Sequence, residues 1–199
     1  MSMNRFAIAG WLAIAGAIMT LPLMATGLIM DIAFQKSAYM NPVFATLYLA
    51  FYVLQVAFVL YAFYRFKVFL NEELAFRKTD ALILVLIAGM VVMSTIGLIG
   101  RIVTWAGATQ SVQGMFVASL FTVGVPLGIL TVIFGVKLLD LGDTGNRLFK
   151  PYAWLNIAGG VCFATFLMAP FGMLIAAVGD VLLGLILLGR GHAAEPEFI

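Results

Sequence analysis

Charge is scarce in this chain of 199 residues. Only 10% of the residues are Asp, Glu, Lys or Arg, whereas 64% are hydrophobic, and the mean hydropathy is +1.12. A soluble domain of this size needs charged side chains on about a quarter of its positions to cover its core. The composition therefore excludes a soluble globular protein and indicates an integral membrane protein.

Histidine and cysteine are almost absent as well. The single histidine, His192, excludes haem ligation by paired histidines and histidine-box iron sites. The single cysteine, Cys162, cannot form a disulfide within the chain. The sequence contains no phosphate-binding loop, metal-ligand cluster or cofactor motif, so we expect no metal, no cofactor and no enzymatic activity. A net charge of +2 without a dense basic patch argues against nucleic acid as a partner.

Long apolar stretches are what the chain does have. A helix needs about 20 apolar residues, each rising 1.5 Å, to cross the hydrocarbon layer of about 30 Å. The sequence therefore predicts an all-α, polytopic membrane bundle of about six transmembrane helices in a single domain, 1–199, with the lipid bilayer as its main partner. The predicted spans are approximately 6–30, 43–64, 81–105, 112–139, 152–169 and 171–189.

Prolines mark the irregular places in these spans. The apolar block from Trp154 to Leu188 is too long for one span, and Pro170 provides its natural break. A hairpin of two short helices is the simplest solution, and a re-entrant pair is the alternative. Pro22 in the first span and Pro126 in the fourth are expected to kink their helices.

The distribution of Lys and Arg predicts the orientation, because basic residues are retained on the cytoplasmic side. Only Lys36 and Arg101 fall on the other side of the predicted spans. We therefore expect a multi-pass protein of the cell membrane with both termini in the cytoplasm. The basic residues assigned to the cytoplasmic side are Arg5, Arg65, Lys67, Arg77, Lys78, Lys137, Arg147, Lys150 and Arg190.

Polar residues inside the spans are the candidate site. Asp180 lies near the middle of the last span, where an ionised carboxylate is expensive unless it is paired or hydrated. Ala176, Asp180 and Gly184 share one small helix face, so Asp180 is expected to point inward. Gln55 lies at a similar depth, and the two could meet. Asp180 is interpreted either as a proton- or cation-binding group or as a polar contact between helices.

A second polar group is predicted at the outer boundary of the membrane. Asp31 and Arg101 fall at similar depth there and are interpreted as an interfacial charge pair. Aromatic residues near the predicted boundaries, such as Trp105 and Tyr152, are interpreted as interfacial anchors.

Two functions remain open from the sequence. The first is a non-enzymatic membrane scaffold or accessory subunit, in which Asp180 and Gln55 serve packing and a membrane protein partner binds the basic loops. The alternative is a small ion- or solute-coupled transporter that uses Asp180 as its intramembrane carboxylate. Such a transporter is expected to be a homo-oligomer, because six helices enclose little room.

Overall fold

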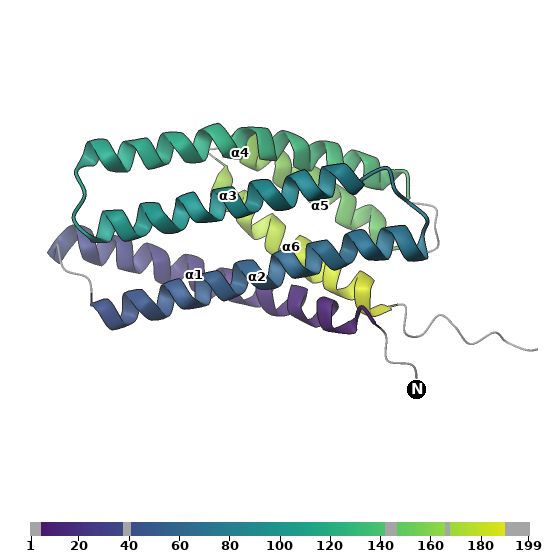
Figure 1. The fold of residues 1–199 in the computed structure, drawn as a ribbon, viewed down its shortest axis with the longest axis horizontal. Coiled ribbons are helices and arrows are strands. Elements are labelled where there is room, and N and C mark those ends of the chain that lie inside the picture. The colour runs from purple at the N-terminus through teal and green to yellow at the C-terminus, as the bar shows by residue number, and fades with distance from the viewer. Residues whose placement is uncertain (1–4, 38–40, 142–146, 166–167, 190–199) are drawn as a thin grey trace, which may run out of the picture.

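The chain folds into helices alone over the part that the computed structural model describes, namely residues 5–37, 41–141, 147–165 and 168–189 (Figure 1). Six helices follow one another along the chain. They are α1 (Ala7–Ser37), α2 (Pro42–Glu73), α3 (Asp80–Trp105), α4 (Gln110–Leu139), α5 (Phe149–Ala164) and α6 (Ala169–Leu188). The predicted all-α bundle is confirmed.

Five of these helices are long and apolar enough to cross a membrane, namely α1, α2, α3, α4 and α6. Helix α5 has 16 residues and therefore rises about 24 Å, less than the hydrocarbon layer of about 30 Å. The fold is that of a helical membrane bundle.

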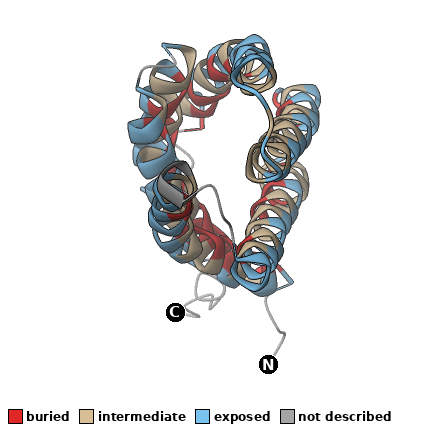
Figure 2. Cartoon of the chain, turned by 90° about the vertical axis from the view of Figure 1, so that its left-hand side faces the viewer, coloured by how far each residue is buried: buried red, intermediate tan, exposed pale blue. Residues whose placement is uncertain are grey.

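The helices are arranged as a ring. Each helix packs against its neighbours in the chain, and α6 returns to pack against α1, which closes the ring. Viewed along the long axis, the helices surround a common centre (Figure 2). Helix α2 also contacts α6 across the ring. The first and last helices of the chain are therefore neighbours.

The two ends of the bundle differ in charge. At one end α1, α3 and α5 begin and α2, α4 and α6 end, and we call this the basic end. The basic residues there include Arg5, Arg65, Lys67, Lys78 and Lys137. The other end carries Asp31, Arg101 and Trp105, and we call it the Trp105 end.

Helices α5 and α6 do not reach the Trp105 end (Figure 1). A Cβ atom at Gly128, in the middle of α4, would lie 2.5 Å from the backbone nitrogen of Ala164, the last residue of α5. About 27 Å of α4, from Gln110 to Gly128, therefore extends beyond α5. The turn between α5 and α6 therefore lies partway along α4. The predicted break is present, with Pro170 in the first turn of α6, where a missing N–H costs nothing.

The packed core fills the half of the bundle nearest the basic end. Its largest buried side chains come from five helices: Phe66, Phe69 and Leu70 of α2, Ile83 of α3, Phe134 and Leu138 of α4, Phe149 and Tyr152 of α5, and Leu183, Ile186 and Leu187 of α6. Small residues let the helix backbones approach there. Gly10 of α1 lies against Gly184 of α6, and Gly128 of α4 lies against Gly160 of α5.

The prolines predicted to kink the first and fourth spans lie inside helices that run through them without interruption. Helix α1 contains Pro22 and has 31 residues, and α4 contains Pro126 and has 30. Each proline leaves the carbonyl four residues earlier without its helical donor. Both positions are therefore weak points of a continuous helix.

Candidate intramembrane site

Asp180 lies at the edge of the packed core. Along its face of α6, Leu183 and Leu187 are fully buried, Asp180 is partly exposed and Ala176 is exposed. Two nearby glycines of α6 show that this part of the helix packs against α5 and α1. Gly179 lies against the ring of Tyr152 on α5, and Gly184 lies against Ile14 on α1. Asp180 therefore marks the level at which the core ends.

The Asp180 carboxylate has no hydrogen bond or ion pair with any residue that the structure describes. The ring of Tyr152, which is almost fully buried, lies against the neighbouring Gly179. An ionised carboxylate at this depth is costly unless water, a cation or a hydrogen-bond donor compensates it. Asp180 is partly exposed as a whole residue. Because no hydrogen bond or ion pair among the described residues holds its carboxylate, binding a proton or a small cation there would break no such contact.

Gln55 forms a hydrogen bond with Thr20. Its Nε2 donates a hydrogen bond of 3.2 Å to Oγ1 of Thr20 on α1, and the Thr20 hydroxyl donates to the Gly16 carbonyl at 3.0 Å. Gly16 gives α2 room to approach, because a Cβ there would lie 3.1 Å from Val59. No hydrogen bond joins Gln55 to Asp180. Thr20, which sequence reasoning passed over, is the polar partner.

The predicted charge pair is present near the Trp105 end. Arg101 Nη2 lies 3.8 Å from Asp31 Oδ2, and Trp105 Nε1 donates a 3.1 Å hydrogen bond to Asp31 Oδ1. The guanidinium lies over the ring of Tyr48, 4.8 Å from its centroid. Gly27 makes the space, because a Cβ there would lie 2.5 Å from a guanidinium nitrogen. This cluster joins α1, α2 and α3.

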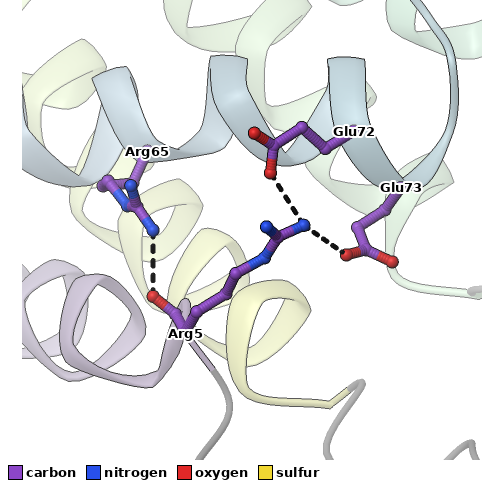
Figure 3. A network of polar contacts seen from close by, with 4 residues as sticks. All are labelled: Arg5, Arg65, Glu72 and Glu73. Carbon is purple, nitrogen blue, oxygen red and sulfur yellow. Dashed lines mark hydrogen bonds and ion pairs between the residues drawn. The ribbon is translucent and has the colours of Figure 1, made fainter.

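The basic end carries a network of polar contacts that joins Arg5, just before α1, to the last turns of α2 (Figure 3). Arg5 Nη2 lies 2.7 Å from Glu72 Oε2 and 3.2 Å from Glu73 Oε1, and Arg65 donates to the Arg5 carbonyl at 3.0 Å. The side chains of Arg5, Glu72 and Glu73 are 58%, 44% and 36% exposed, so water and salt screen the pairs.

We expect Arg5→Gln to lower the free energy of unfolding by less than about 1 kcal/mol, because exposed ion pairs contribute little. The measurement is thermal unfolding of the detergent-solubilised protein at low and high NaCl. The small difference from the wild type should vanish at high salt. A larger loss that salt does not change would show that Arg5 acts through packing on Phe6 instead.

The described residues contain no cluster of metal ligands. Within residues 5–37, 41–141, 147–165 and 168–189, no three His, Cys, Asp or Glu side chains come together to hold a metal ion. Comparisons with protein-family models, with curated proteins and with solved structures find no match to this chain. The six helices, five of them long and apolar enough to cross a membrane, are those of a multi-pass helical membrane bundle.

Proposed function

We propose that this protein is a small membrane carrier coupled to protons or small cations, with Asp180 as the group that binds them. The observation that carries the proposal is that Asp180 is a partly exposed residue at the edge of the core and that its carboxylate has no hydrogen-bond or ion-pair partner among the described residues. Intramembrane carboxylates of this kind are typical of ion pathways and proton relays.

The uneven packing supports a direction of access. In the half of the bundle nearest the Trp105 end, Met30 and Tyr48 are the buried apolar side chains among the described residues. The opposite half is filled by aromatic and aliphatic residues. A cation or proton therefore meets less packed protein between Asp180 and the Trp105 end. By the positive-inside rule we expect the basic end in the cytoplasm and the Trp105 end on the outer side of the membrane.

A membrane scaffold or accessory subunit is the second candidate. The hydrogen bond between Gln55 and Thr20 supports it, because this bond joins α1 to α2 and has no evident role beyond packing. The charged side chains at the basic end would then form the surface for a membrane protein partner. In this role Asp180 would be protonated and would contribute only to helix packing.

The two functions separate on Asp180→Asn, which keeps the size of the side chain and removes its titration. We expect purified wild-type protein in liposomes to move protons when a sodium or potassium gradient is imposed, as followed by a pH-sensitive dye inside the vesicles. Asp180→Asn should reduce the rate at least tenfold, because a neutral amide neither binds a cation tightly nor releases a proton at neutral pH.

The matched control is Asp140→Asn, which makes the same substitution in an exposed ion pair with Lys78 at the basic end. It should retain the wild-type rate. Proton movement that survives Asp180→Asn would contradict the assignment of Asp180. A wild-type protein that moves no protons under either gradient would contradict the carrier and favour the scaffold.

A further inference from the structure

A separate apolar groove lies between α1 and α2 near the Trp105 end. It has a volume of about 730 Å³. Pro22 and Thr26 of α1 line it, and we call them its floor. The larger Ile18, Ile29 and Phe44 line it as well. None of these residues belongs to the Asp180 site, so the groove is independent of the proposed carrier function.

The groove opens on the outer surface of the ring. Helix α1 turns Gly16, Thr20 and Gly27 toward α2 and α3, whereas the groove residues lie on a different face of the same helix. Ile18 is 66% exposed and Ile29 is 67% exposed. On a membrane-spanning helix, a large apolar side chain that faces away from the bundle faces lipid.

The groove is at least as long as one leaflet of the bilayer is thick. Its lining runs along α2 from Asn41 to Phe51, a rise of about 15 Å, and along α1 from Ile18 to Ala33, a rise of about 22 Å. Half of a hydrocarbon layer of about 30 Å is also about 15 Å. The end nearest the membrane surface is polar, because Asn41 caps α2 there by accepting a hydrogen bond from the Val43 amide.

The side chains around the groove favour a flexible chain over another helix. Transmembrane helices that pack closely do so through small residues on both surfaces. Here α2 contributes Phe44, Leu47 and Phe51, which would hold a helix backbone away from the floor. A single hydrocarbon chain is narrow enough to lie between these side chains and Pro22.

We propose that this groove binds one acyl chain of a phospholipid from the leaflet at the Trp105 end. The bound chain fills the space between α1 and α2 in the half of the bundle that has little core of its own. The lipid is thereby held at a fixed site, in contrast to the lipids that exchange freely around the rest of the surface.

The test is native mass spectrometry of the delipidated full chain titrated with dioleoylphosphatidylcholine. Thr26→Phe puts a ring into the floor of the groove. Thr95→Phe is the matched control, because Thr95, like Thr26, is an exposed threonine on a long apolar helix, and it lies on α3 outside the groove. Circular dichroism checks that both variants keep the helix content of the wild type. Phe44→Ala is a further test variant, because it removes a groove side chain without adding bulk.

We expect one tightly bound lipid per chain for the wild type and for Thr95→Phe. Thr26→Phe should weaken that binding at least tenfold, and Phe44→Ala should weaken it in the same direction. Equal binding by Thr26→Phe and the wild type would overturn the proposal, as would a wild type that binds no lipid preferentially. A dimer that Thr26→Phe dissociates would overturn it too, because a second copy of the chain would then occupy the groove.

Discussion

Phe66→Ala is expected to lower the free energy of unfolding by about 3 kcal/mol. This is the lower end of the range for replacing a buried phenylalanine with alanine. Phe66 is fully buried, and its ring contacts the rings of Phe69, Phe149 and Tyr152. The lower end applies because lipid already solvates apolar groups, so the loss comes mainly from packing contacts. Unfolding in a mild detergent titrated with a denaturing detergent measures the change.

The control for this prediction is Phe171→Ala. Phe171 lies in the first turn of α6 and is 56% exposed, so its loss should change the unfolding free energy by less than about 0.5 kcal/mol. Similar losses for the two variants would mean that the aromatic cluster between α2 and α5 does not hold the bundle together.

Gly128→Ala is expected to destabilise the protein by about 2 kcal/mol through overpacking. The new Cβ would lie 2.5 Å from the backbone nitrogen of Ala164 and 2.7 Å from the carbonyl oxygen of Gly160. Backbone atoms of a neighbouring helix cannot rotate away as a side chain can, so α4 and α5 must separate. The same unfolding titration measures the loss.

Gly114→Ala is the matched control in the same helix. A Cβ at Gly114 meets no atom within 4 Å, and alanine is the better helix former by about 0.5–1 kcal/mol. We expect this variant to be as stable as the wild type or slightly more stable. If Gly128→Ala were equally harmless, the close contact between α4 and α5 described above would be wrong.

The sequence was a good guide to the class of fold and to the order of the spans. Length and apolar composition alone predict helices at α1 to α4, because a helix is the only open structure that satisfies its backbone in lipid. The early end of α5 at Ala164 was not predictable. The residues that follow it are as apolar as the helix itself, and only Pro170, several positions later, signals a break.

Side-chain contacts were harder to predict than spans. The Asp31–Arg101 pair follows from depth counting and is present, but Tyr48, whose ring lies under the guanidinium, was missed. Tyr152 was interpreted as an interfacial anchor, whereas it is buried against Phe66. The reason is common to both errors. In a membrane the outer surface and the core are both apolar, so no polar face reveals which way a helix is turned.

The contact between α1 and α6 has a consequence for how the bundle assembles during synthesis. Helix α1 is made first and α6 last, and they are the two helices that close the ring. The contact between Gly10 of α1 and Gly184 of α6 therefore cannot form until α6 has been synthesised. A nascent chain shortened before α6 would leave that face of α1 without its partner helix.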